Sequence, residues 1–248
     1  MNPRGSVCGR TKSLTNDPND PKIVVWTKLQ VPPGEELDSY CQPLLHAVGH
    51  ESTVWAREQG NPDIVMLATL WYTTSELRDF MASPSAQLYR ESLANASIVP
   101  LISWETIHGY GSWFGPLSRS FTQLFWVYFP APMTQAQQAE ISSLRGIRPP
   151  VMGFSIPQSQ LRQRHLPVQL WATQTEHLHG QEAQLMLWPH FWRDAEKAKW
   201  RFSGTGSYWG SPTERFIEDL EKVGPIEWKE ELYEFRLAER SDPLLLVT

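Results

Sequence analysis

A single histidine lies among tryptophans in the segment from Ala183 to Phe202, and this arrangement is the clearest sign of chemistry in the sequence. Side chains alternate between the two faces of a strand, so Trp188, His190 and Trp192 are predicted to share one face. An imidazole in such a pocket can act as a general acid or base near neutral pH. The alternative interpretation of His190 is a hydrogen-bonded core histidine, and the sequence leaves both open.

Four glutamates crowd the last predicted strand. Alternation sends Glu227 and Glu231 to one face and Glu230 and Glu234 to the other, so one pair is expected to face the interior. Burial there would raise the pKa of the carboxyl group and allow it to pair with a partner such as His190. A solvated run of charges is the simpler alternative.

Other histidines have spacings that metal sites use. His46 and His50 are one helical turn apart, and His177 and His179 share a strand face. No cysteine or carboxylate set completes either group, so we expect no metal site. The sequence also has no glycine-rich phosphate loop and no nucleophile elbow, and we expect no cofactor.

The composition predicts a folded, intracellular protein. Its 248 residues are 41% hydrophobic and 12% aromatic, with 12 tryptophans, which is ample for a core and for an aromatic pocket. The net charge of −5 and the lack of a basic run argue against nucleic acid or an anionic membrane as partner. Cys8 and Cys41 are a poor disulfide pair, so a cytoplasmic protein is expected.

Strand and helix signals occur in the same order twice. Val54-Trp55-Ala56 parallels Leu170-Trp171-Ala172, and the helix start Ser83-Pro84 parallels Ser211-Pro212. Capping boxes at Thr73 and Thr134 begin two further helices, one in each half. The expected strands cover residues 23–31, 52–59, 64–72, 97–107, 123–129, 168–177, 183–192 and 226–237. The prediction is an α+β chain of two tandem ferredoxin-like (β-α-β-β-α-β) halves, packed sheet to sheet as an α/β barrel. Residues 1–21 would be a flexible tail, 22–116 the first half and 117–248 the second.

Trp71 followed by TTSELRDFMASPSAQLY resembles the third strand and helix of the dimeric α/β-barrel superfamily, which includes antibiotic-biosynthesis-monooxygenase-like and stress-responsive barrel proteins. The resemblance implies that the two sheets enclose a pocket for a small molecule. It further implies a tandem two-copy chain of the kind found in fungal secondary metabolism, acting as a monomer or homodimer. Fold alone does not fix the reaction.

The repeat assigns faces to the strands. Matching Trp71 with Phe191 places both toward the helices and puts Tyr72 and His190 inside the barrel. The same alternation puts Arg57 inside, where it and Tyr72 would stabilise an oxyanion while His190 transfers the proton. The residues expected to line the substrate pocket are Trp55, Trp104, His108, Trp171, Thr173, Trp188, Trp192 and Tyr208. Tyr208 would belong to a lid formed by residues 203–210.

These features predict a cofactor-independent tailoring enzyme that cyclises, dehydrates or isomerises a hydrophobic polyketide-like or polycyclic metabolite. A cofactor-free oxygenase of a phenolic or anthrone-like substrate is the alternative, because it needs the same base and the same apolar cavity. Two further classes stay open, namely a non-catalytic small-molecule binding protein and a haem protein with His190 as the axial ligand.

Overall fold

Two β-α-β-β-α-β halves follow one another in the computed structural model, which describes residues 19–109, 111–147, 163–165, 167–199 and 212–240. The first half consists of β1 (Ile23–Gln30), α1 (Gln42–Leu45), β2 (His50–Glu58), β3 (Asn61–Trp71), α2 (Thr74–Met81), α3 (Pro84–Asn95) and β4 (Val99–Ile107). The second consists of α4 (Phe114–Leu117), β5 (Phe121–Pro130), α5 (Gln135–Ser143), β6 (Gln163–His165), β7 (Leu170–Leu178), β8 (Gln181–Trp192), α6 (Ala195–Ala198), α7 (Pro212–Lys222), β9 (Glu227–Tyr233) and β10 (Arg236–Leu237).

The predicted helix starts are confirmed by their caps. The Thr73 hydroxyl accepts the Glu76 N–H at 3.1 Å, and Thr134 and Gln137 form a complete capping box. Ser83 caps α3 directly before Pro84. Leu37, Tyr40, Cys41, Leu44 and Val48 recur at a spacing that predicts a longer helix, but only one turn, α1, is helical there. None of the helices in the described ranges is long and apolar enough to cross a membrane.

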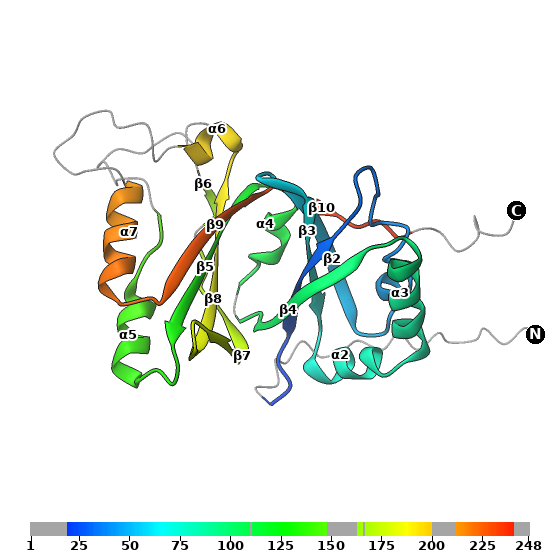
Figure 1. Ribbon diagram of the computed structural model, residues 1–248, viewed down its shortest axis with the longest axis horizontal. Coiled ribbons are helices and arrows are strands. Elements are labelled where there is room, and N and C mark those ends of the chain that lie inside the picture. The colour runs from blue at the N-terminus through cyan, green and yellow to red at the C-terminus, as the bar shows by residue number, and fades with distance from the viewer. Residues whose placement is uncertain (1–18, 110, 148–162, 166, 200–211, 241–248) are drawn as a thin grey trace, which may run out of the picture.

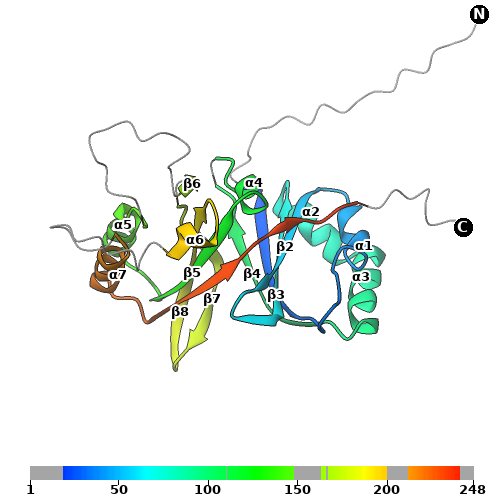
Figure 2. The ribbon, with the colours of Figure 1, turned by 90° about the horizontal axis from the view of Figure 1, so that it is seen from above.

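The strands close into an antiparallel eight-stranded barrel in the order β2-β3-β1-β4-β7-β8-β5-β9, with β9 returning to β2. Helices α1, α2 and α3 lie outside the first sheet and α5 and α7 outside the second, so the strands form the middle of the molecule (Figure 1). The two seams between the halves are narrow: β4 pairs with β7 only at Thr106 and Ala172, and β2 with β9 only at Glu58 and Tyr233. After β9 the chain crosses to the first half, where β10 pairs with β2 (Figure 2).

The barrel interior is filled by its own apolar cluster, distinct from the two clusters beneath the helices. Trp26 and Trp126 come from the two sheets, and α4 with the residue before it adds Trp113, Phe114 and Leu117. Trp113 stacks on Trp26 with ring centroids 6.1 Å apart. The segment that joins the halves therefore helps to fill the space between them.

The register shows that the predicted match between the halves is one residue out. Trp71 pairs with Ile23, the first residue of β1, whereas Trp192 pairs with Phe121, the first residue of β5. The structural equivalent of Trp71 is therefore Trp192 and not Phe191. A shift of one residue exchanges the two faces of a strand, so the faces predicted for β8 are wrong. Those predicted for β3 are correct, since Leu70 is inside and Trp71 faces the helices.

Candidate active site in the barrel interior

His190 lies outside the barrel, on the helix side of β8, and its predicted place in the interior is wrong. Its side chain is fully buried in the cluster beneath α7, edge-on to Phe125 and Phe216 with ring centroids 5.1 and 5.4 Å away. Nε2 accepts the N–H of Ile147 at 3.0 Å, so Nδ1 carries the proton and donates it to the Trp188 carbonyl at 3.0 Å. Both nitrogens are used, and neither is available to a substrate or to a haem iron.

The loop after α5 is shaped to reach this histidine. Gly146 has a φ of +69°, and a Cβ there would lie 2.9 Å from the His190 Nε2, so glycine allows the close approach. Burial lowers the pKa of His190 to about 3. The imidazole is therefore neutral at physiological pH and serves as a hydrogen-bonded core residue, which was the alternative interpretation of the sequence.

The other two predicted catalytic residues are also outside the interior. Arg57 donates hydrogen bonds to the carbonyls of Pro62, Pro32 and Glu35 at 2.6, 3.2 and 2.7 Å, and so ties down the loop after β1. Tyr72 follows β3, is 37% exposed and lies under the Lys22 ammonium at 5.1 Å. Neither is placed to stabilise an oxyanion between the sheets.

Most of the residues predicted to line the pocket also lie outside the barrel interior. Trp55 packs on the helix side of β2, beneath Arg236. Thr173 is exposed beside the irregular stretch of β7. Trp171, Trp188 and Trp192 all pack on the helix side of the second sheet. Tyr208 and the proposed lid at residues 203–210 lie outside the described residues.

Two residues of the predicted lining do reach the interior. Trp104 on β4 packs against Trp126 with ring centroids 4.6 Å apart, and its N–H donates to Glu176 on β7 at 3.2 Å. His108 at the end of β4 is buried and stacks on Trp113 at 5.1 Å. Burial lowers the pKa of His108. Trp104 therefore forms part of the aromatic wall of the barrel interior, and His108 lies at one end of that wall.

The charged groups of the interior are Lys28 and Glu231. Lys28 on β1 reaches across from the first sheet, and its ammonium donates a hydrogen bond to Glu231 on β9. The side chains are 11% and 7% exposed. Tyr233 donates its hydroxyl to the other oxygen of Glu231 at 2.7 Å. Glu227 and Glu231 are thus the glutamate pair on the interior side. This is one of the two pairs that strand alternation allowed.

The cluster continues outward from this pair. Lys229 lies 3.7 Å from Glu231, and its side chain is 43% exposed, so it forms the rim. The ammonium groups of Lys28 and Lys229 lie 4.7 and 5.4 Å from the centre of the Trp126 ring. The Trp126 N–H is buried and has no hydrogen-bond partner among the described residues. We call Lys28, Lys229, Glu231, Tyr233 and Trp126 the interior cluster.

Burial sets the protonation behaviour of these groups. It lowers the pKa of Lys28, against the opposing effect of Glu231. It raises the pKa of Glu58, which also lies near Glu231, and the pKa of Tyr233. The cluster therefore offers an ammonium whose proton is less tightly held than usual, beside a carboxyl group, Glu58, that accepts a proton more readily than usual. Such perturbed groups are typical of sites of proton transfer.

Sequence reasoning missed Lys28, although a signal was present. Val24, Trp26 and Lys28 alternate along β1, so a lysine occupies a position whose neighbours on that face are apolar. A lysine in that register is either at a barrel end or paired in the interior. Among the described residues, no group of three or more histidines, cysteines or carboxylates is arranged to hold a metal ion.

Comparison with known proteins supports the fold and does not name a family for this chain. No protein-family model and no curated protein matches the sequence. A solved "anthrone oxidase-like protein" is 13% identical, with 91% of this chain and 97% of that chain covered and a TM-score of 0.53. A "putative monooxygenase" from Fusobacterium nucleatum is 7% identical, with coverages of 88% and 93% and a TM-score of 0.50.

At these identities the likeness shows the architecture alone. The chain has the α/β-barrel fold of ferredoxin-like halves that its sequence resembles, and both halves are supplied by one chain. The fungal character that the resemblance implied stays a prediction. The chemistry rests on the residues of the barrel interior.

Proposed function

We propose that this chain is a cofactor-independent tailoring enzyme that deprotonates a flat phenolic or enolisable polycyclic metabolite at the interior cluster. One observation carries the proposal: the Lys28 ammonium, bonded to Glu231, lies inside a barrel walled by tryptophans. An ammonium in low dielectric stabilises a developing phenolate or enolate far better than one in water does. The ring of Trp104, which is only partly buried, is suited to stacking on a flat ligand.

Each residue of the cluster has a separate task in this proposal. Glu231 takes the proton from the substrate carbon or oxygen, and Tyr233 keeps its carboxylate oriented. Lys28 moves its hydrogen bond from Glu231 to the new oxyanion. The free N–H of Trp126 donates to the same oxygen. The substrate enters from the rim, where the Lys229 side chain is partly exposed. Ile102 on β4, which pairs with Lys28, is exposed at the same rim.

Two outcomes can follow the deprotonation. In the first, the anion is reprotonated at another atom, which gives isomerisation, or expels a hydroxyl group as water, which gives dehydration. It can also attack a carbonyl carbon of the same molecule, whose oxygen then takes the proton, which gives cyclisation. In the second, the anion reacts with dioxygen: a ring CH₂ and O₂ give a ring C=O and water, the change from an anthrone to an anthraquinone. The structural similarity to an anthrone oxidase-like protein makes the second outcome the alternative reaction.

Hydroxylated anthrones test both outcomes with one substrate. Absorbance distinguishes the anthrone, its enol form and the quinone, and an oxygen electrode reports the consumption of O₂. Turnover without oxygen uptake supports acid–base chemistry alone, and matched uptake supports oxidation. Glu231→Gln should slow turnover by a factor on the order of 10²–10⁴.

The matched control is Glu234→Gln, which makes the same change at an exposed position three residues along the chain. It should retain the rate of the unmodified protein. Tight binding of anthrones with no turnover would contradict the proposal and identify a binding protein instead. Equal rates in the two variants would remove Glu231 from the mechanism.

A further inference from the structure

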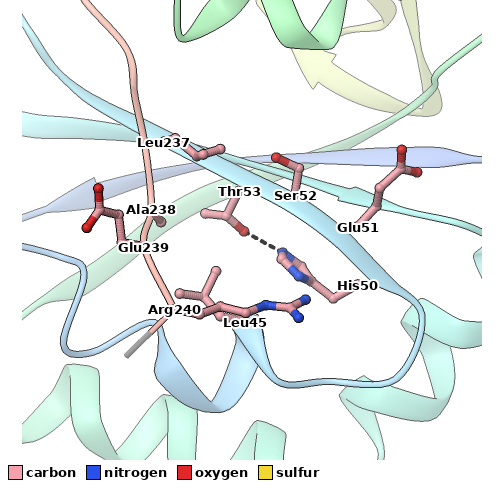
Figure 3. Close-up of a pocket in the computed structure, with 9 residues that line it drawn as sticks. All are labelled: Leu45, His50, Glu51, Ser52, Thr53, Leu237, Ala238, Glu239 and Arg240. Atoms are coloured by element: carbon pink, nitrogen blue, oxygen red, sulfur yellow. Dashed lines mark hydrogen bonds between the residues drawn. The ribbon is translucent and has the colours of Figure 1, made fainter. Parts of the chain in front are cut away.

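A hollow of about 440 Å³ opens on the first half, on the far side of β2 from the barrel interior (Figure 3). Strand β2 contributes four consecutive residues beginning with His50, α1 contributes Leu45, and the segment from Leu237 to Arg240 forms the opposite wall. Its volume lies within the range of small-molecule sites. It shares no residue with the interior cluster.

The Arg240 guanidinium is the cationic group of this hollow. It has no hydrogen-bond or ion-pair partner in the part of the chain that the structure describes. Arg236, four residues earlier, differs, since it pairs with Glu36 and stacks on the Trp55 ring at 3.6 Å. A planar guanidinium with free donors is suited to binding a carboxylate with two parallel hydrogen bonds.

His50 lies beside Arg240 and adds a second polar group (Figure 3). Its Nε2 shares a hydrogen bond with the Thr53 hydroxyl at 2.7 Å. Its Nδ1 is buried and forms no hydrogen bond of normal geometry among the described residues; the backbone of Leu45 and Ser52 lies close enough to raise the pKa of the ring, and the whole residue is 6% exposed. An unsatisfied buried nitrogen of this kind indicates a missing ligand or water.

The nearby carboxylates of Glu51 and Glu239 do not pair with Arg240 or His50. Glu51 is occupied by Lys22 at 2.6 Å. The carboxylate of Glu239 points to the opposite side of the chain segment from the Arg240 guanidinium (Figure 3). Burial, and then the charge of Arg240, lower the pKa of His50 to about 4. An anion placed between the two would offset the charge of Arg240, favour the protonated imidazole and so raise this pKa.

The rest of the wall is apolar. Leu45 and Ala238 are buried at its base, and Leu237 is 52% exposed at its edge. A bare oxyanion would leave this surface unused. We propose that the hollow binds a small apolar monocarboxylate, with the carboxylate on Arg240 and His50 and the hydrocarbon on Leu45, Leu237 and Ala238. The inference is independent of the reaction proposed for the interior cluster.

Benzoate and hexanoate are the probes, with neutral benzamide and inorganic phosphate as comparisons, and isothermal titration of the full chain as the measurement. Both carboxylates should bind and benzamide should not. Arg240→Gln should weaken benzoate binding on the order of tenfold or more, because a charged hydrogen-bonding partner is lost. Arg236→Gln, the matched control on the same segment, should leave the affinity unchanged.

The ring signals of His50 give a second readout by NMR. Adding benzoate should raise its titration midpoint in the unmodified protein. In Arg240→Gln, adding benzoate should not change the midpoint. Equal binding of benzamide, binding of phosphate without benzoate, or unchanged affinity in Arg240→Gln would each overturn the proposal. So would a His50 midpoint that does not respond to saturating benzoate.

Discussion

Polar groups are buried in two regions of the second sheet, and they are buried in opposite ways. On the helix side, His190 is neutral and both of its nitrogens are bonded to the backbone. On the interior side, Glu231 is bonded to Lys28 and Tyr233, with Lys229 at a rim that solvent reaches. The histidine has no capacity left for a ligand. The interior cluster has an exposed edge and an unsatisfied indole N–H.

The comparison shows why residue type alone misleads. A histidine among tryptophans looks like a catalytic base, yet its surroundings fully satisfy and neutralise it. A buried ion pair contributes little or nothing to stability relative to an apolar pair of the same volume. A protein that keeps one between its sheets therefore gives a reason to look for function there, and variants of the two regions should behave differently.

The largest effect on stability is expected from breaking the interior pair. Lys28→Met leaves the buried Glu231 carboxylate with only the partly exposed Lys229 ammonium, 3.7 Å away, and removal of one partner of a buried pair typically costs about 3–5 kcal/mol. Urea unfolding would measure the change in the free energy of unfolding. Lys28→Met combined with Glu231→Leu should recover much of the loss, since no unpaired charge remains.

A double-mutant cycle provides the control for this expectation. If the double variant is as unstable as the sum of the two single variants, the two charges do not interact in the folded protein. The double variant should also be inactive toward the test substrates even where it is well folded. Retained activity would separate the cluster from the reaction.

A smaller effect is expected at His190. His190→Phe keeps the aromatic bulk but removes the nitrogen that accepts the Ile147 N–H, and the loss of one intramolecular hydrogen bond costs about 0.5–1.5 kcal/mol. The same variant should turn over substrate at the interior site as fast as the unmodified protein does. If turnover slows about a hundredfold or more without a matching loss of folded protein, His190 returns to the mechanism as a general acid or base.

The pH dependence of stability should change in the same variant. The pKa of His190 is about 3 when folded and about 6.5 when unfolded. Between these values the unfolded chain binds a proton that the folded chain does not, so stability falls as the pH drops from about 6.5 toward 3, by about 1.4 kcal/mol per pH unit. Subtracting the profile of His190→Phe should isolate this slope; identical profiles would contradict the low pKa.

The architecture was predictable because its signals are local and repeated. The Thr73 and Thr134 caps, the strand alternation and the doubled element order all depend on neighbouring residues, and the closed barrel of two halves is confirmed. Which face of β8 lies inside was not predictable in this way. It depends on a pairing with β5 that one extra residue in β8, 12 residues long against 11 in β3, shifts by one position.

The interior cluster was hidden for a related reason. Lys28 and Glu231 are 203 positions apart, and nothing near either residue in the sequence identifies the other. Alternation did narrow the glutamates to two pairs, one of which contains Glu231. A pair that forms across two sheets becomes visible only when the barrel closes.

The smallest effect is expected at the narrow seam where β4 meets β7. These strands share one backbone pairing, at Thr106 and Ala172, and the hydrogen bond from Trp104 to Glu176 adds a side-chain link at 3.2 Å. Trp104→Phe removes this donor and keeps an aromatic wall against Trp126. A single hydrogen bond of this kind contributes on the order of 1 kcal/mol.

The seam is also the boundary at which the aromatic wall of the interior meets solvent, so local opening there should be more sensitive to Trp104→Phe than global unfolding is. Amide hydrogen exchange measures the two separately, because opening of one seam and unfolding of the whole barrel expose different amides. We expect faster exchange in β4 and β7 and unchanged exchange in β5 and β8, which pair along the whole of β5. Uniformly faster exchange over all strands would mean that the two halves separate only when the whole barrel unfolds.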